Sequence, residues 1–365
     1  MSISYKKFRL PPWERSKGLS SVLKPLGWLY GAGMEIRNRL YDWGLFRSHF
    51  LPIPVISIGN LAVGGTGKTP LTIEITKGLL KRNPDLKLGI LSRGYRRKTT
   101  DRWIVSDGKE ILMGVAESGD EPRLIARSLP GVKVFVGADR VAVAKKALAR
   151  FDLDLLILDD AFQHRRIHRD VDILLVDAET GLGGGRVLPS GPLREFPWNV
   201  KRATCLVVSR FNERIHPDIR RFCPPEIPIF KVRMAVSGIQ DAMSGEVVPL
   251  EEIRNKDVWG VCGIARPASF LKSLEILKLR LAGFSAFPDH HDYTERDFQG
   301  ILQEAGEEAP VVTTEKDWVK WEGRHPFRKV YVVPAHLEFV EGEEIYDFIE
   351  PFVYNKRKGV EGGVI

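Results

Sequence analysis

Cysteine is scarce in this chain, which contains three cysteines among 365 residues. An odd number at wide spacing fits neither a disulfide framework nor a zinc-binding pattern, so we expect inert thiols in a reducing, cytosolic compartment. A secretion signal is not expected either, because lysines and prolines occupy the stretch 6–12 and no cleavable apolar core follows them. These scarcities exclude a disulfide-rich secreted domain.

Acidic residues are outnumbered, with 47 Asp and Glu against 55 Lys and Arg, and the net charge is +8. Such a balance favours an anionic partner, which is a nucleic acid, an acidic membrane surface or a phosphorylated substrate; an ordinary basic protein is the alternative. A hydrophobic content of 43% with 28% charged residues is typical of a globular protein, and the length is sufficient for two domains.

Long apolar runs are missing from the N-terminal fifty residues. The longest uncharged run before residue 48, Pro25–Met34, is too short to span a bilayer. Apolar residues between Leu26 and Arg47 recur at helical spacing, with the arginines off this stripe. Periodicity leaves two interpretations open: a helix lying in the membrane interface with its Trp and Tyr rings at headgroup depth, or a helix packed against its own domain.

The most informative stretch is PVISIGNLAVGGTGKTP, at Pro54–Pro70. A β-branched run leads into a glycine-rich turn, and Gly67-Lys68-Thr69 opens an amphipathic stretch, Leu71–Leu80. This is the order of strand, phosphate-binding loop and helix in a P-loop. The glycines let the backbone turn sharply and aim N–H groups at phosphate oxygens, and the helix N-terminus attracts anions.

The loop predicts a site for a nucleoside triphosphate. Lys68 would reach the β- and γ-phosphates, and the Thr69 hydroxyl would bind Mg²⁺. One residue departs from the motif, since Ala62 stands where the first glycine belongs, and a single methyl group is a small change there. The predicted nucleotide-binding residues are Ala62, Val63, Gly64, Gly65, Thr66, Gly67, Lys68 and Thr69.

Short apolar runs alternate with helical patterns after the loop. Because buried parallel strands read as continuous apolar runs, the pattern predicts a doubly wound, mostly parallel α/β sheet whose ligands lie at the carboxyl ends of the strands. The expected strands are Lys87–Ser92, Val132–Val136, Asp154–Leu158, Asp172–Val176 and Cys205–Ser209, with a helix at Ala142–Arg150.

Three polar clusters follow these strands. Ser92–Arg97 is cationic and is interpreted as a phosphate contact or a solvated basic loop. Ser118–Pro122 carries two carboxylates on a tight turn and is also consistent with a helix cap. Asp159–His164 places two acids at a Walker B position, where a carboxylate holds Mg²⁺ directly or through water. The glycine- and proline-rich stretch Gly181–Pro197, which includes Arg186, Arg194 and Glu195, is predicted to be an irregular binding loop.

The last third predicts a second, smaller α/β domain. Phe230–Pro249 alternates like a β-ribbon that joins the domains, and Val258–Gly263 restarts a strand–helix pattern. Pro288–Asp292, on a loop of this domain, is expected to support acid–base chemistry, with metal ligation as the alternative. Thr313–Asp317, TTEKD, fits either helix capping or a nucleotide contact. The predicted divisions are 1–50, 51–228, 229–250, 251–355 and a loose tail at 356–365.

Several of these motifs together resemble those of the tetraacyldisaccharide 4′-kinases. The similarity extends in the same order over roughly residues 20–350, which makes a chance match remote. The motifs are AVGGTGKTP at 62–70, SRGYRR at 92–97, SGDEP at 118–122, DDAFQH at 159–164, LPSGPLRE at 188–195, FPDHHDY at 287–293 and TTEKD at 313–317.

The resemblance implies an enzyme that uses ATP and Mg²⁺ to phosphorylate the 4′-hydroxyl of the tetraacyldisaccharide 1-phosphate precursor of lipid A. It favours the interfacial interpretation of the N-terminal helix and a peripheral, monotopic position on the cytoplasmic face of the bacterial inner membrane. It implies neither a nucleic acid nor an obligate protein partner. The alternative is a membrane-associated P-loop NTPase that acts as a regulatory or partitioning switch.

Residue roles follow from the same resemblance. It implies Asp120, His290 and Lys68 as catalytic residues, with Asp120 as the base and Asp289 beside His290. Gln163 joins the nucleotide-binding residues. The implied metal ligands are Thr69, Asp159, Asp160 and Glu195, and the implied substrate-binding residues are Arg93, Tyr95, Arg140 and His164.

Overall fold

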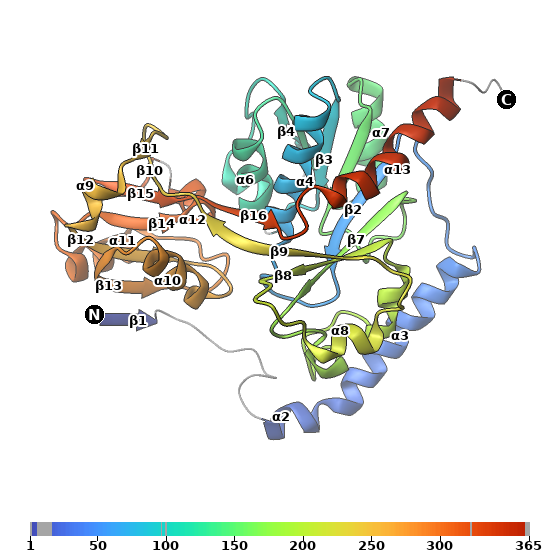
Figure 1. Ribbon diagram of the computed structural model, residues 1–365, viewed down its shortest axis with the longest axis horizontal. Coiled ribbons are helices and arrows are strands. Elements are labelled where there is room, and N and C mark those ends of the chain that lie inside the picture. Colours follow the sequence, from blue (N-terminus) through green and yellow to red (C-terminus); the bar gives the residue numbers. More distant parts are fainter. Residues whose placement is uncertain (1, 6–16, 96, 99–100, 322, 362–365) are drawn as a thin grey trace. The chain divides into compact units, whose positions relative to one another are not determined.

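The computed structural model describes residues 2–5, 17–95, 97–98, 101–321 and 323–361 (Figure 1). Two compact units divide the chain. The P-loop unit comprises Leu10–Arg233 and Leu337–Ile365, and the C-terminal unit comprises Met1–Arg9 and Met234–His336. Arg96 of the basic cluster and the stretch 6–12 lie outside the described residues.

A nine-stranded sheet forms the P-loop unit, in the order β16-β9-β8-β7-β2-β6-β3-β5-β4. The strands from β9 to β5 in this order run parallel, and β4 is antiparallel to β5. All five strands predicted after the loop are confirmed. The bounds are β2 Val55–Asn60, β3 Leu88–Ser92, β4 Ile104–Asp107, β5 Lys133–Val136, β6 Leu155–Asp159, β7 Val171–Asp177, β8 Cys205–Ser209, β9 Ile229–Val236 and β16 Ala335–Phe339.

Both faces of this sheet are covered, which explains the unbroken apolar runs. Successive side chains of a strand point to opposite faces. Ile157 accordingly packs in the core that includes α4 and α13, whereas Leu156 and Leu158 pack in the core that includes α7. The helices of the unit are α2 Lys17–Val22, α3 Lys24–Asp42, α4 Lys68–Arg82, α5 Val115–Ser118, α6 Asp120–Ser128, α7 Arg140–Arg150, α8 Pro217–Phe222 and α13 Glu344–Glu361, with 3-10 turns at Gly183–Gly185 and Pro197–Arg202.

The C-terminal unit has its own sheet of seven strands, in the order β1-β13-β12-β14-β15-β10-β11. Two apolar clusters form its core. The strands are β1 Ser2–Tyr5, β10 Ile239–Asp241, β11 Val247–Val248, β12 Asp257–Cys262, β13 Arg280–Ala286, β14 Val311–Thr314 and β15 Val330–Val333. The helices are α9 Leu250–Arg254, α10 Pro267–Ile276, α11 Glu295–Ala305 and α12 Glu315–Trp321.

The connection between the units differs in detail from the predicted ribbon at 229–250. The chain leaves the P-loop unit along β9 and returns along β16, and these two strands are neighbours in the nine-stranded sheet. β10 and β11 pair with each other and belong to the other sheet. The stretch 229–250 therefore contributes to both sheets, because each half finds its hydrogen-bonding partners in a different unit.

The two ends of the chain also depart from the predicted divisions. Residues 2–5 form β1, which pairs in parallel with β13 of the C-terminal unit, so 1–50 is not a single helical segment. Helix α13 continues to Glu361, through much of the predicted loose tail. Among the described helices, none has the length and apolar character needed to cross a membrane.

Candidate active site

The glycine-rich loop is held in shape from two sides. Thr66 accepts a hydrogen bond from Asn60 Nδ2 at its hydroxyl (2.8 Å) and from the Ser209 hydroxyl at its carbonyl (3.0 Å). On the other side, the Val63 N–H donates to the carbonyl of Pro192 (2.8 Å). Gly67, with φ of 98°, lies immediately before α4, in a left-handed conformation that favours glycine. The loop is therefore preorganised for phosphate.

Asp159, at the end of β6, is fully buried. Its carboxylate accepts hydrogen bonds from Thr72 of α4 (2.9 Å) and from Ser92 at the end of β3 (3.3 Å). Burial, with Glu121 and Asp160 nearby, raises the pKa of Asp159 to about 7. A cation at this position would favour the ionised form.

Asp160 forms ion pairs with two cationic side chains of this unit. Its carboxylate accepts from Arg194 at 2.9 Å and lies 3.9 Å from the Lys68 ammonium. Burial alone would raise the pKa of Asp160, but Lys68 and Arg194 hold it below its usual value. The P-loop lysine, the Walker B segment and the loop 181–197 thus meet at one carboxylate.

Arg140 lies next to the backbone of Asp159 and Asp160, and His164 lies near Arg140. Arg140 is buried and donates to the backbone carbonyls of Asp159 (3.3 Å) and Asp160 (3.0 Å). Burial, together with Arg140, Arg166 and other arginines, lowers the pKa of His164 to about 3, so the imidazole is neutral at physiological pH. Its buried Nε2 has no hydrogen-bond partner among the described residues.

Glu195 and Gln163 link the Walker B segment to helix α3. Both oxygens of the fully buried Glu195 accept from Arg202 at 2.7 Å. Asn38 of α3 donates to Glu195 at 2.6 Å, and Gln163 donates to it at 3.0 Å. Since donors of this chain occupy both oxygens, these contacts favour a structural role over metal binding for Glu195.

Asp120 begins α6 directly after Gly119, whose φ is 90°. A side chain at Gly119 would meet the carbonyl of Tyr95 at 2.9 Å, so the glycine lets the SRGYRR loop approach the SGDEP turn. Asp120 is 7% exposed, while Arg93 and Tyr95 are exposed. The structure therefore brings Asp120, Arg93 and Tyr95 together beside the carboxyl end of β3. Ser92, the last residue of this strand, donates a hydrogen bond to Asp159.

His290 belongs to the C-terminal unit. It lies in the loop between β13 and α11 with φ of 57°, and its Nε2 is 3.6 Å from Asp289. The adjacent His291 is bonded to Asp297 instead (3.0 Å). Among the described residues, no group of three histidine, cysteine or acidic side chains forms a metal site, so the metal alternative for this loop gains no support.

Helix α3 packs one face on the P-loop unit and exposes the other. Gly31 lies against the ring of Phe196, which a Cβ atom would meet at 2.5 Å, and Arg37 donates to the carbonyl of Gln163 (2.7 Å). The exposed apolar side chains of α3 and the residues after it are Leu26, Trp28, Leu29, Tyr30, Ile36, Trp43, Leu45, Phe46 and Phe50. One face of α3 therefore packs on its own unit, as one of the two interpretations predicts, and the other face presents apolar and aromatic side chains to solvent.

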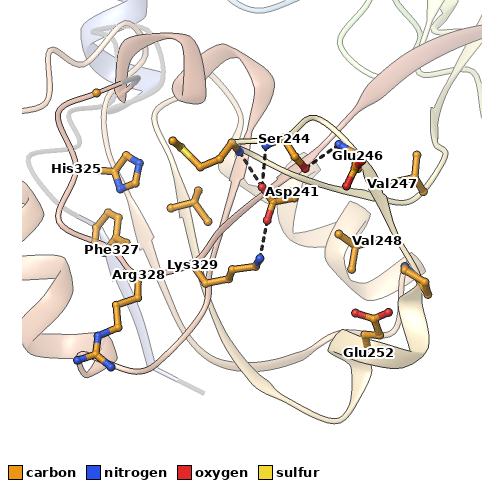
Figure 2. Close-up of a pocket in the computed structure, with 14 residues that line it drawn as sticks. Asp241, Ser244, Glu246, Val247, Val248, Glu252, His325, Phe327, Arg328 and Lys329 are labelled. Carbon is orange, nitrogen blue, oxygen red and sulfur yellow. Dashed lines mark hydrogen bonds and ion pairs between the residues drawn. The ribbon is translucent and has the colours of Figure 1, made fainter.

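A separate cavity of about 800 Å³ lies within the C-terminal unit (Figure 2). It is bordered by the β10–β11 hairpin and the segment before β15, where Asp241 pairs with Lys329 (2.6 Å). None of the residues predicted for the site lines it.

Some residues of the cluster were missed by residue-level prediction. Arg194 was noted as a charged residue of the loop at 181–197, but its ion pair with Asp160 was not predicted. Its position next to Glu195, a predicted site residue, could have indicated that it belongs to the site. Thr72, which no local pattern marks, donates to Asp159 from α4. Ser92 belongs to the polar cluster singled out in the sequence, but its hydrogen bond to Asp159 was not predicted.

A parallel doubly wound sheet, a preorganised glycine-rich loop before α4 and two adjacent acids at the end of β6, the first of them buried, define a P-loop nucleoside triphosphate-binding protein. The sequence profile described as Tetraacyldisaccharide-1-P 4′-kinase, LpxK, matches residues 19–353. The chain belongs to this family.

Relatives of known name agree with the profile. The tetraacyldisaccharide 4′-kinases of Anaeromyxobacter dehalogenans (strain 2CP-C) and Desulfotalea psychrophila are each 40% identical to this chain; the matches cover 80% and 83% of this chain and 78% and 88% of the relatives. A crystal structure of LpxK from Aquifex aeolicus in complex with ATP is 33% identical, with a TM-score of 0.76, over 92% of this chain and all of that one.

Proposed function

We propose that this chain transfers the γ-phosphate of ATP to the 4′-hydroxyl of a tetraacyldisaccharide 1-phosphate, the step that gives lipid A its 4′-phosphate. The observation that carries the proposal is the meeting of Lys68, Asp160 and Arg194 beside the preorganised loop, in a chain that belongs to the 4′-kinase family. ATP is the phosphoryl donor of such a kinase, and Mg²⁺ is its metal.

The donor half of the site fits Mg²⁺ and ATP. Mg²⁺ is typically held by one or two carboxylates together with substrate phosphates, so the absence of a three-residue metal cluster among the described residues is consistent with it. Thr69, Asp159 and Asp160 would hold the ion, which neutralises developing phosphate charge. Residues Ala62–Thr69 bind the phosphates, and Gln163 fixes the neighbouring backbone of Asn60 (2.9 Å).

Asp120 is proposed as the base that orients the acceptor hydroxyl and takes its proton. It is supported by its low exposure at the ligand edge of the sheet and by an Oδ1 held by the N–H of Glu121 (3.0 Å). His290 of the C-terminal unit is proposed as a further catalytic residue. Lys68 contributes positive charge toward the transferred group.

The acceptor half uses Arg93, Tyr95, Arg140 and His164. Arg93 and Tyr95 offer an exposed cation and ring beside Asp120, and a neutral His164 can donate or accept one hydrogen bond. Glu195 holds α3 to this half through Asn38 rather than binding the metal.

We propose further that the exposed apolar face of α3 binds the membrane surface, on the cytoplasmic side of the inner membrane. An interfacial helix inserts an apolar face with aromatic residues and keeps its cations near anionic lipid. Trp28 is 65% exposed and Leu29 72% exposed, and Arg39, further along the same helix, is exposed to solvent as well. An acylated acceptor lies in that same surface.

The test is transfer of labelled γ-phosphate from ATP to purified tetraacyldisaccharide 1-phosphate in detergent micelles. The expected product is a lipid bisphosphate, and the Lys68→Ala variant should form it at a small fraction of the rate. Rapid release of phosphate to water, without a lipid product, would instead identify the NTPase switch.

A further inference from the structure

The TTEKD motif at 313–317 has no role in the proposed chemistry. Two of its residues, Lys316 and Asp317, nevertheless contact the loop that carries His290. Lys316 and Asp317 belong to α12, and the loop at 287–293 connects β13 to α11 in the same unit. The contacts of these two side chains show what the motif does for that loop.

Asp289 divides its two carboxylate oxygens between different partners. Oδ1 accepts from the Lys316 ammonium at 2.9 Å and from the backbone N–H of His290 at 3.0 Å. Oδ2 lies 3.6 Å from Nε2 of His290. Lys316 thus fixes the rotation of the carboxylate, and the carboxylate faces the imidazole with its second oxygen. The side chains of Lys316 and Asp289 are 19% and 26% exposed, so the ion pair is shielded from much of the solvent.

Asp317 secures the same loop at its other end. This fully buried carboxylate accepts from the hydroxyl of Tyr293 (3.1 Å) and from the N–H of Gly263 (2.8 Å). It also pairs with Lys320 (2.7 Å) and caps α12 together with Thr314. Helix capping is therefore one role of the motif, and a second is to hold the loop at Tyr293.

The loop needs such support because His290 has a positive φ of 57°. A residue other than glycine is disfavoured at positive φ, and it keeps this conformation only when surrounding contacts hold it there. His291, bonded to Asp297, and Tyr293, bonded to Asp317, supply two of these contacts. Lys316, through Asp289, supplies the contact that acts on His290 itself.

We propose that Lys316 is a positioning residue for His290, acting through Asp289. The inference rests on the proposed role of His290 in phosphoryl transfer. Without the ammonium, Asp289 keeps the N–H of His290 on Oδ1 but loses the charged group that fixes its rotation, and the imidazole loses its defined orientation. Misplacing a reacting or supporting group by about 1 Å costs up to about 100-fold in rate.

The experiment compares Lys316→Met, Lys316→Arg and His290→Ala in the full-length enzyme with the lipid acceptor in micelles. Lys316→Met should lower kcat by about 10- to 100-fold. Its KM for ATP should stay close to that of the wild type, because the ATP-binding loop belongs to the other unit. Its melting temperature should change little, because Asp297 and Asp317 still hold the loop. Lys316→Arg, which keeps the charge and can reach the same oxygen, should recover most of kcat. Lys272→Met, at an exposed lysine of α10, is the matched control and should leave kcat unchanged.

A double variant separates positioning from a general loss of structure. Because Lys316 acts through His290, adding Lys316→Met to His290→Ala should cause no further loss. A further independent loss overturns the inference, as does an unrescued Lys316→Met variant with a lowered melting temperature. Wild-type turnover of Lys316→Met beside an inactive His290→Ala overturns the role of Lys316 and leaves that of His290 in place. Full activity of His290→Ala overturns both.

Discussion

Asp159 and Asp160 are adjacent in sequence, yet their surroundings shift the pKa values of the two carboxyl groups in opposite directions. Asp159 faces hydroxyl groups inside the sheet, whereas Asp160 turns outward to Lys68 and Arg194 with φ of 46°. Carboxylates whose environments push their pKa values apart can serve different roles at one site. We propose that Asp160 stays ionised beside the phosphates, whereas Asp159 becomes fully ionised when the metal ion binds.

Replacing Asp120 by alanine tests the proposed base. Turnover should fall by about 100- to 10,000-fold, the range that a positioned base contributes, while ATP affinity is retained because the phosphate loop is unchanged. Steady-state lipid phosphorylation and the binding of a fluorescent ATP analogue are the two measurements. Near-normal turnover would place the base elsewhere.

Replacing Asp317 by asparagine tests the buried anchor of the C-terminal unit. Burial alone would raise the pKa of Asp317, but Lys320 and the N–H of Gly263 hold it below its usual value. Because the folded pKa is lowered, the charged form stabilises the fold above the unfolded pKa of about 3.9, and this stability is lost as the pH falls through the folded value.

The Asp317→Asn variant should therefore be less stable at pH 7 by about 3–5 kcal/mol, since Lys320 is left buried without its partner. The difference from the wild type should narrow below about pH 4. Urea unfolding followed by tryptophan fluorescence at pH 7 and at pH 3 measures both values. A difference that widened on acidification would contradict the assignment.

At the scale of elements, α13 is packed against α4, the helix that begins at Lys68. Gly78 allows this contact, because a Cβ atom there would lie 2.0 Å from Cζ of Tyr346. The Tyr346 hydroxyl donates to the carbonyl of Glu74 (3.2 Å), and Arg82 pairs with Asp347 (2.6 Å). The C-terminal helix thus fixes the helix that presents the phosphate-binding lysine.

Gly78→Ala tests this contact. Alanine favours a helix by about 1 kcal/mol, but overpacking against a fixed ring costs about 1–3 kcal/mol, so we expect net destabilisation. The KM for ATP should rise, because α4 carries Lys68. Thermal unfolding and ATP titration measure the two effects, and Tyr346→Leu in the same chain should reverse part of both. A more stable Gly78→Ala variant would show that the ring moves freely.

How well the sequence predicted each element depended on the range of its contacts. Strands such as β3 and β6 were predictable because burial on both faces leaves an apolar run in the sequence. β1 was not, since its four residues carry no pattern and their partner is β13, near the other end of the chain. The site shows the same limit: the loop and its acids have local motifs, whereas the bond of Glu195 to Asn38 joins segments far apart in sequence.

At the scale of the whole molecule, α3 is proposed to set the side that faces the lipid surface. Leu29→Ser with Ile36→Ser removes two exposed apolar side chains, 72% and 61% exposed, from that helix. Each side chain contributes up to about 1.5–3 kcal/mol when fully buried, so flotation with anionic vesicles should fall at least tenfold. ATP binding should be unchanged. Val247→Ser, at an exposed site of the C-terminal unit, is the control. Equal flotation of the wild type, the double variant and this control would refute the proposal that α3 binds the membrane surface.

The pairing of β1 with β13 has a consequence for synthesis on the ribosome. Ser2 leaves the exit tunnel long before its partner Gly283, which follows only after α3, the loop and strands β2 to β9 have emerged. The P-loop unit in turn awaits β16 and α13, which follow the strands of the C-terminal unit in the sequence. Domains normally fold in order from the N-terminus. Here the P-loop unit cannot be completed before the C-terminal unit has been made, so β9 stays without its neighbour β16 while β10 to β15 are synthesised.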